Sequence, residues 1–283
     1  MSPKVSVLIP CYKAQATIAE TIEGLLAQTV EDWECILVSD DGTSYLDHLA
    51  GCGIRDPRLI EHPERSNGTG TVAPRNRGMA LVKGGYVADL DADDIWKPER
   101  LEHLLPLAEE HGCVQDVLEC FSADGDIGWS GPPDGAVETL TPEGVVGFDF
   151  PFHLVVRRDR AGALWSPHDN WVPDVVRTLR FAVVEPVCWL REPLLRYRVS
   201  AASMSQSLDG AVRIDQAYTD ILADLGAPGA LGLSEGDRLT AADGFRRKRR
   251  LNRDYMEAVS DRPTPPPFLA WILAQGLSGV AVS

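Results

Sequence analysis

The chain has 283 residues, of which 44% are hydrophobic and 24% charged, and its formal net charge is −15 with a pI of about 4.8. This length suffices for one large domain or two small ones, and the composition is that of a soluble globular protein. The acidic balance argues against general nucleic-acid binding, since phosphate backbones need clustered Lys and Arg. The acidic balance still permits the binding of a single nucleotide through a metal ion.

Apolar runs alternate with helical patterns over the first 110 residues. Residues 5–9 predict a buried strand, and Thr17 with Glu20 predicts a capping box at the start of a helix. Two further strands are predicted at 33–38 and 86–90, and helices at 75–82 and 98–110. Strands that alternate with helices in this way indicate an α/β fold with a mostly parallel sheet.

The second half is less regular. Residues 122–149 are rich in Gly, Pro, Asp and Ser and predict loops and short strands. From about residue 210 the pattern is helical, with a break near 226–229, and the prolines of 263–267 end the last clear helix. Further strands are predicted at 152–157, 181–190 and 194–199.

The cysteines indicate the compartment. None of the six forms a C-x-x-C pair and several lie in apolar surroundings, so we expect reduced, mostly buried thiols of a cytoplasmic protein.

The chain enters an apolar run almost at once, which predicts no secretory signal. No apolar stretch reaches the length of a membrane span, and the nearest, at 268–282, is interrupted by Gln275, Gly276 and Gly279.

Polar residues follow three of the predicted strands, at 10–12, at 40–41 and at 91–94. Parallel strands place their carboxyl ends at one edge, where such sheets bind ligands, so we expect the three clusters to share a crevice. The last cluster, Asp-Ala-Asp-Asp, repels itself unless a cation is present or some carboxylates are protonated. Such hard oxygen donors suit Mg²⁺ or Mn²⁺ with a phosphorylated substrate. A solvated loop with a helix cap is the alternative.

Four segments in order resemble family 2 of the glycosyltransferases: VSVLIPCY at 5–12, VSDDGT at 38–43, PRNRG at 74–78 and LDADDIW at 90–96. The resemblance is strong over 3–105 and weaker over 150–205. It implies the GT-A fold, a Rossmann-like, mixed and mostly parallel central sheet flanked by helices. Together with the helical tail, the resemblance implies a glycosyltransferase domain of residues 1–215 and a C-terminal helical extension of residues 216–283. The domain would consist of a nucleotide-sugar half (1–115) and an acceptor half (116–215).

The resemblance also implies roles for matching positions. Asp93 would ligate Mn²⁺ or Mg²⁺, with Asp91 as a second ligand. Asp94 and Arg198 would contact the donor or its phosphates, although Arg198 fits a structural ion pair equally well. Nucleotide contacts are implied for Pro10, Tyr12, Asp40, Asp41, Arg75 and Asp91.

A catalytic base is implied at residues 167–171, PHDNW, where the family has an acidic pair at the start of a helix. Asp169 matches the second member and would take the proton of the acceptor hydroxyl, with inversion at the anomeric carbon. His168 replaces the usual Glu and is a second candidate base, or a metal or phosphate contact. A helix cap is the alternative for Asp169. Ser200 stands where the family often has His.

The predicted function is therefore metal-dependent transfer of a sugar from a UDP- or GDP-sugar to a carbohydrate or lipid-linked acceptor, in glycan, cell-envelope polysaccharide or glycolipid synthesis. One alternative is a non-catalytic protein that binds sugar nucleotides. Another is a nucleotidyltransferase, a class that usually has a Gly-rich loop with a basic residue after the first strand. Residues 10–14, PCYKA, have no such glycines.

Two features of the second half suggest partners. Trp129, Trp165 and Trp171 lie in the acceptor half and are candidates for stacking on sugar, although tryptophans more often fill cores. The basic run of 245–250, with Arg253, suits anionic lipid at the inner face of a membrane, although a solvated helix face is commoner. The apolar tail could join it there, form a homodimer contact or pack on the main domain.

Overall fold

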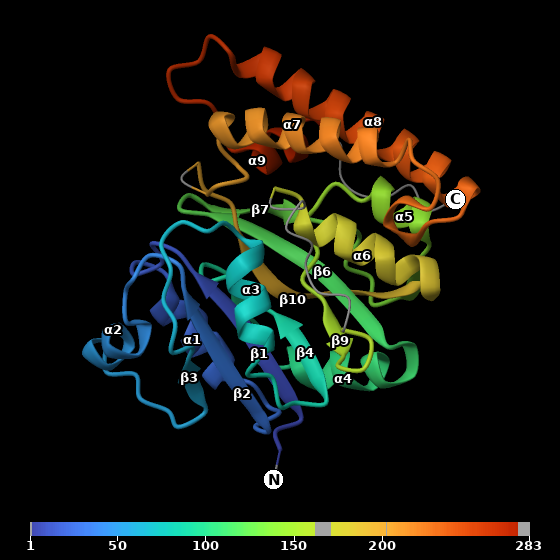
Figure 1. Cartoon of the computed structure of the whole chain (residues 1–283). Coiled ribbons are helices and arrows are strands. Elements are labelled where there is room, and N and C mark those ends of the chain that lie inside the picture. Colours follow the sequence, from blue (N-terminus) through green and yellow to red (C-terminus); the bar gives the residue numbers. More distant parts are fainter. Residues whose placement is uncertain (1, 162–170, 202, 277–283) are drawn as a thin grey trace.

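The computed structural model describes residues 2–161, 171–201 and 203–276. Its N-terminal half alternates strands with helices, as the sequence predicts (Figure 1). The strands β1, β2, β3 and β4 run parallel, with β1 between β2 and β4. The elements are β1 (Val5–Cys11), α1 (Ile18–Leu26), β2 (Trp33–Ser39), α2 (Tyr45–Gly51), β3 (Leu59–Glu61), α3 (Val72–Met79) and β4 (Tyr86–Asp89).

The same sheet continues into the second half. Its elements are β5 (Ile95–Trp96), α4 (Arg100–His111), β6 (Cys113–Ser122), β7 (Gly125–Trp129), β8 (Val137–Leu140), α5 (Pro142–Gly147), β9 (Val155–Arg157), α6 (Pro173–Val184) and β10 (Val187–Arg198). The strand order is β3-β2-β1-β4-β9-β6-β10-β5, with β7 paired to β6 and β8 to β10.

The direction of these strands fixes where polar ends meet. β9 is antiparallel to both β4 and β6, and β6 is parallel to β10. The strands β1, β2, β4, β6 and β10 therefore all end at the same edge of the sheet. The predicted fold class, a mixed and mostly parallel α/β sheet flanked by helices, is confirmed.

Four predicted elements need correction. The helix predicted at 75–82 is α3, which starts at Val72 and ends at Met79. The strand predicted at 181–190 is wrong in its first part, because Phe181 to Val184 form the last turn of α6. The strand predicted at 152–157 shortens to β9, and the two strands predicted up to residue 199 are one, β10.

The predicted capping box is also wrong. The Thr17 side chain does not accept a bond from the start of α1. Its hydroxyl donates instead to the carbonyl oxygens of Ala92, at 2.8 Å, and Ala14, at 3.3 Å. The carboxylate of Glu20 forms an ion pair with Arg198. Both side chains of the supposed box are therefore used for tertiary contacts.

The C-terminal helices are α7 (Leu208–Asp224), α8 (Glu235–Val259) and α9 (Phe268–Ala274), and a short 3₁₀ turn, Ala230–Gly232, follows the predicted break near 226–229. In Figure 1, α7 and α8 (orange to red) lie side by side across the end of the molecule away from the N-terminus. α7 runs across residue 215, the predicted domain boundary. The hydrophobic cluster of the sheet extends to Phe245 of α8 and Leu269 of α9.

Much of the basic run of α8 is neutralised inside the protein. Arg247 and Lys248 form ion pairs with Asp149, and Lys248 is buried. Arg249 and Arg253 both form ion pairs with Asp215 of α7. These contacts fasten α8 to its neighbours and reduce the charge available to a lipid surface. Among the described residues, no helix is both long and apolar enough to cross a membrane.

All six cysteine thiols are free, and only Cys52 is exposed, which agrees with the expectation of reduced and mostly buried thiols.

A buried ion pair joins α4 to the middle of the sheet. The Arg100 guanidinium donates to Asp116 of β6 through Nε, at 3.1 Å, and Nη2, at 2.8 Å, and both side chains are 0% exposed. Nη2 also donates to the carbonyl oxygen of His153 at 2.8 Å, and the guanidinium stacks on Trp96. Removing one partner of such a pair leaves the other charge buried and unpaired.

Arg100→Met should therefore lower the free energy of unfolding by about 3–5 kcal/mol, measured by urea denaturation. Arg246→Met is the matched control, because Arg246 and its partner Asp243 are both largely exposed and such pairs contribute at most about 1 kcal/mol. Equal stability losses in the two variants would contradict this account of the buried pair.

Candidate active site at the carboxyl edge of the sheet

The two aspartates after β2 hold loops together. Asp40 is 3% exposed and accepts hydrogen bonds from Ser66 and from the amide and hydroxyl of Thr69. Asp41 accepts from the amide of Lys13 at 2.7 Å and from the hydroxyl of Tyr45 at 2.9 Å. Both carboxylates thus have partners within the protein, and a contact to a base remains a prediction for them.

The environment of Asp41 keeps it ionised. Partial burial acts to raise its pKa, but the hydrogen bonds it accepts, from the amides of Thr43 and Lys13 and from Tyr45, outweigh this and lower the pKa to about 2. The bond from Lys13 ties the end of β1 to the end of β2. Beside it, Tyr12 is 51% exposed, as a side chain that lines an open base pocket would be.

Helix α3 lies between the two acidic clusters. Its Arg75 forms an ion pair with Asp91, and its Arg77 lies 3.9 Å from Asp40. The Arg75 side chain is 10% exposed and that of Asp91 is 36% exposed, so this pair opens to solvent on the aspartate side. The structure thus brings together the predicted nucleotide residues Arg75 and Asp91.

Residues 91–94, here called the carboxylate loop, pass from β4 to β5 across the edge of the sheet. Burial raises the pKa of Asp93 to about 6, and the charge of Asp91 adds to the shift. Burial, with the charges of Asp93 and Asp91, raises the pKa of Asp94 well above its usual range. Asp91 is paired with Arg75, but Asp93 and Asp94 are poorly neutralised by the protein itself, which is the electrostatic condition that a divalent cation relieves.

The carboxylate loop is fixed from two sides. On one side, Thr17, the residue before α1, donates to the Ala92 carbonyl. On the other, Arg198 at the end of β10 donates through its amide to Asp94 Oδ1, at 2.8 Å, and through Nε to the Asp93 carbonyl, at 2.9 Å. Arg198 therefore has a structural role, and its predicted contact with donor phosphates remains a prediction.

The helix that follows Thr17 packs closely against the start of β5. A Cβ atom at Gly24 of α1 would lie 2.9 Å from Ile95 and 3.0 Å from the carbonyl oxygen of Trp96. Only glycine at this position allows α1 to approach β5 this closely. The contact holds β5, the strand at which the carboxylate loop ends.

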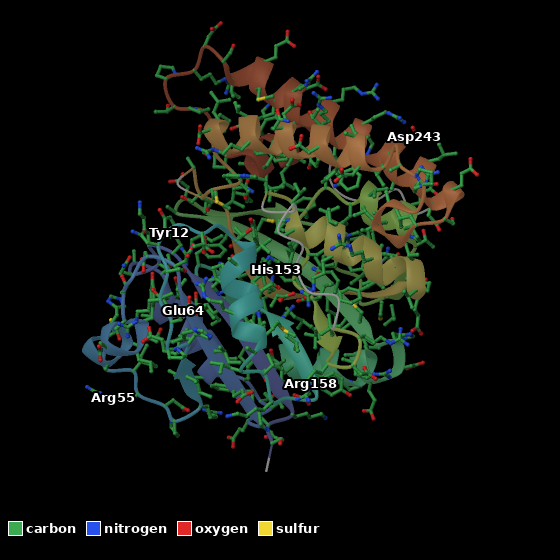
Figure 2. All side chains as sticks on the ribbon, viewed as in Figure 1. Tyr12, Arg55, Glu64, His153, Arg158 and Asp243 are labelled. Atoms are coloured by element: carbon green, nitrogen blue, oxygen red, sulfur yellow. The ribbon has the colours of Figure 1, made fainter. Side chains whose placement is uncertain are left out.

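His153 is a site residue that the sequence analysis missed. It lies just before β9, is 2% exposed, and its Nε2 is 3.6 Å from Asp94 Oδ2. Burial lowers the pKa of His153, which keeps the imidazole neutral. In the view of Figure 2, His153 lies near the middle of the molecule and Tyr12 toward its left side. No spacing in the sequence connects residue 153 to residue 94, so only the fold reveals the pair.

The predicted catalytic residues Asp169 and His168, with Trp165, lie outside the described residues. Trp171 is described, and the guanidinium of Arg213 from α7 stacks on its ring at 5.2 Å. The two side chains border a hollow of about 250 Å³, together with Gln216, Ala217 and Asp220.

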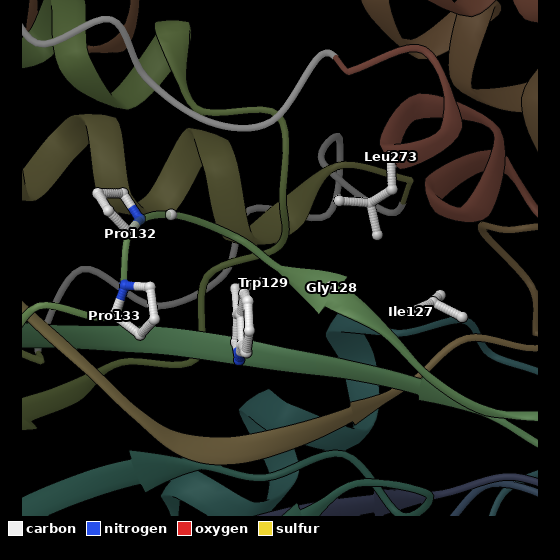
Figure 3. Close-up of a pocket in the computed structure, with 7 residues that line it drawn as sticks. Ile127, Gly128, Trp129, Pro132, Pro133 and Leu273 are labelled. Atoms are coloured by element: carbon white, nitrogen blue, oxygen red, sulfur yellow. The ribbon is translucent and has the colours of Figure 1, made fainter.

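A second hollow lies along β7. Trp129, which is 48% exposed, stands in it with Pro132, Pro133 and Leu273 of α9 (Figure 3). Its volume is about 360 Å³. None of its lining residues belongs to the acidic clusters, so this hollow is distinct from the site described above.

Solved structures confirm the class of fold. The protein is similar to residues 1–349 of TarS from S. aureus in complex with UDP-GlcNAc, with a TM-score of 0.65 and 17% identity over 92% of this chain and 76% of the other. It is also similar to the mannosyltransferase PcManGT from Pyrobaculum calidifontis in complex with GDP-Man and Mn²⁺, with a TM-score of 0.59 and 16% identity over 98% and 80%. At such identities the likeness defines the GT-A fold alone.

Sequence comparison gives the family. The model of glycosyl transferase family 2 matches residues 6–161, more than half of the chain, and the chain belongs to this family. The putative teichuronic acid biosynthesis glycosyltransferase TuaG of Bacillus subtilis is 36% identical over 116 residues, 40% of this chain and 44% of TuaG. The putative colanic acid biosynthesis glycosyl transferase WcaA of Escherichia coli is 32% identical over 106 residues, 37% of each. The chain thus spans less than half of these relatives.

The raised pKa of Asp93 predicts how the metal-free protein responds to pH. A carboxyl whose pKa rises from 3.8 to about 6 on folding favours the folded state below pH 3.8, and this contribution is lost as the pH rises through 6. In EDTA, Asp93→Asn should therefore stabilise the protein at pH 7.5 by on the order of 2 kcal/mol, and this gain should vanish near pH 4.

Urea unfolding of both proteins at the two pH values measures this difference. Asp124→Asn serves as the control, because Asp124 is exposed on a turn and its replacement should change stability little at either pH. A gain for Asp93→Asn that is the same at pH 4 and pH 7.5 would show that charge repulsion in the carboxylate loop is not its cause.

Proposed function

We propose that the protein transfers a sugar from a UDP- or GDP-sugar to an acceptor hydroxyl with inversion, using Mn²⁺ or Mg²⁺ at the carboxylate loop. The observation that carries the proposal is the gathering of Asp91, Asp93 and Asp94 at the edge where the parallel strands end, where burial and the neighbouring carboxylates raise the pKa of the latter two. Oxygen donors at such an edge suit a divalent ion that also binds phosphate.

The solved structures of similar fold support the choice of donor and cofactor. TarS is described in complex with UDP and with UDP-GlcNAc, and PcManGT with GDP-Man and Mn²⁺. We carry over only the shared chemistry, a nucleoside diphosphate sugar and a divalent cation. Tyr12 and Asp41 follow β1 and β2 at the same edge of the sheet as the carboxylate loop, which supports the proposal that they contact the base. Arg75 adds a positive charge close to the diphosphate.

Each residue contributes a separate part of the chemistry. A divalent ion at Asp91 and Asp93 supplies Lewis-acid stabilisation of the leaving diphosphate. Arg198 and Thr17 hold the carboxylate loop in place before the donor binds, so no reorganisation is needed at the moment of transfer. Asp169, by the resemblance, takes the proton of the acceptor hydroxyl, a role that typically contributes 10²–10⁴-fold in rate.

The acceptor is proposed from the relatives. TuaG and WcaA are named for teichuronic acid and colanic acid biosynthesis, so we propose a growing polysaccharide or its lipid-linked precursor as the acceptor. The exposed Trp129 and the partly exposed Trp171 offer ring faces for sugar in this half of the protein. A protein that binds the donor without transfer is the remaining alternative, and turnover of donor in the presence of acceptor separates the two.

Metal-dependent binding of nucleotide is the first test. UDP or GDP together with Mn²⁺ should raise the melting temperature of the wild-type protein more than either component alone, because each completes the other's coordination. Asp93→Ala should abolish the extra shift. Differential scanning fluorimetry with and without EDTA measures it.

The matched control is Asp124→Ala, which removes an exposed carboxylate far along the chain from the loop. It should keep the full shift. If Asp93→Ala kept it as well, the metal would have to bind elsewhere, and this part of the proposal would be withdrawn.

Asp169→Asn tests the catalytic base. The variant should bind the donor as the wild type does, because the predicted donor contacts lie in the first half of the chain and at Arg198. Its transfer rate should fall by about 10²–10⁴-fold. His168→Gln, measured beside it, separates the two candidate bases by release of UDP or GDP in the presence of acceptor. Wild-type transfer by Asp169→Asn would refute its role.

A further inference from the structure

Three potential metal ligands from two separate segments meet beneath the carboxylate loop. Asp91 and Asp94 belong to the loop, and His153 belongs to the segment before β9. One ligand atom of each, two carboxylate oxygens and an imidazole nitrogen, lie within 4.8 Å of one another. His153 was not among the residues that the sequence predicts, and Asp93 is not part of this group.

Two of these atoms face each other without a hydrogen bond. Asp94 and His153 are 0% and 2% exposed, and within the described residues neither Asp94 Oδ2 nor His153 Nε2 has a hydrogen-bond partner. Buried polar atoms are nearly always bonded, and leaving one unsatisfied costs about 1–3 kcal/mol. Two such atoms aimed at one point indicate a ligand that both would share.

The distance between them fits a shared cation better than a shared proton. At 3.6 Å, Nε2 and Oδ2 are too far apart for a normal hydrogen bond. Two ligands that are each about 2.1 Å from one ion lie roughly 3.0–3.5 Å apart. A small approach of the two side chains would therefore place both at bonding distance from the same ion.

The imidazole is held in position by its main chain. The His153 amide donates to Gln115 Oε1 at 2.7 Å, and its carbonyl oxygen accepts from Arg100 Nη2 at 2.8 Å. The preceding amide, of Phe152, donates to Asp174 at the start of α6. These bonds fix the backbone from which the His153 imidazole extends toward Asp94. The first oxygen of Asp94 is bound by the amide of Arg198, which leaves the second oxygen for the ion.

We propose that His153 is a direct ligand of the divalent ion, together with Asp94 and with Asp91 as the ligand shared with the carboxylate set of the proposed function, on which this inference rests. The Asp91 side chain is 36% exposed and connects the buried pair to the open side of the site. A nitrogen ligand makes the site favour Mn²⁺ and Co²⁺ over Mg²⁺ more strongly than oxygen ligands alone would.

Pulsed electron paramagnetic resonance on the Mn²⁺-loaded protein tests the ligand directly, because a coordinated imidazole nitrogen modulates the electron spin echo. The wild type should show this modulation. His153→Gln should lose it and bind Mn²⁺ at least 10-fold more weakly by titration calorimetry, with a smaller change for Mg²⁺. Second-sphere partners alone typically alter affinity 10–100-fold, so the echo, rather than the affinity, decides.

Two control variants make the result specific. His103→Gln removes an exposed histidine that contacts Glu192, and the modulation should persist. His168→Gln removes the other histidine that the sequence associates with metal, and the modulation should again persist. If His153→Gln does not fold, the wild type and His168→Gln with ¹⁵N-labelled histidine decide the question. If the proposal holds, the nitrogen coupling to Mn²⁺ must then change from that of ¹⁴N to that of ¹⁵N in both proteins.

The failures are distinguishable. Mn²⁺ that binds with no nitrogen coupling in the wild type would overturn the His153 ligand and leave the metal-dependent function intact, with His153 and Asp94 as a structural pair. Nitrogen coupling that disappears in His168→Gln would also overturn it. Absence of any Mn²⁺ binding, with UDP or GDP present, would remove both this inference and the metal requirement of the proposed function.

Discussion

The burial of Asp93 and Asp94, together with their repulsion by each other and by Asp91, is the constraint on which the site depends. Three carboxylates within four residues, two of them largely withdrawn from water, make the folded protein carry an electrostatic cost that the local chain cannot remove. The surrounding structure responds with fixed hydrogen bonds from Thr17 and Arg198 rather than with a buried cation for each acid. This leaves negative potential concentrated at one point of the sheet edge, open on the side of Asp91.

Much of the N-terminal half could be predicted from the sequence, because strands that are buried on both faces consist of short apolar runs. The strands at 5–9, 33–38 and 86–90 appear as predicted, and so does the acidic loop that follows the last of them. β6 was not predicted, since it carries Gln115, Asp116 and Glu119, which look unsuited to a central strand. In the fold each has a partner: Gln115 binds His153, Asp116 binds Arg100, and Glu119 binds Lys97 and Arg196.

The other misjudgements have the same origin in tertiary contacts. The last turn of α6, Phe181 to Val184, is apolar and β-branched, so its local preference for a strand was overruled by the helix it completes. The membrane contact suggested for the basic run of α8 stays a prediction, although ion pairs with Asp149 and Asp215 use much of its charge. His153 could not be assigned at all, because its significance arises from the residues that face it across the sheet.

The hydrogen bond from the Arg198 amide to Asp94 has a consequence for cooperation between the two halves of the protein. Arg198 ends the long strand of the predicted acceptor half, and Asp94 belongs to the loop of the predicted donor half. The two predicted halves therefore share this hydrogen bond. By thermodynamic reciprocity, if a ligand on one side of this hydrogen bond changes the affinity for a ligand on the other side, the second ligand changes the affinity for the first by the same factor. A single strand end can therefore link the affinities of the two predicted halves for their ligands, whichever ligand binds first.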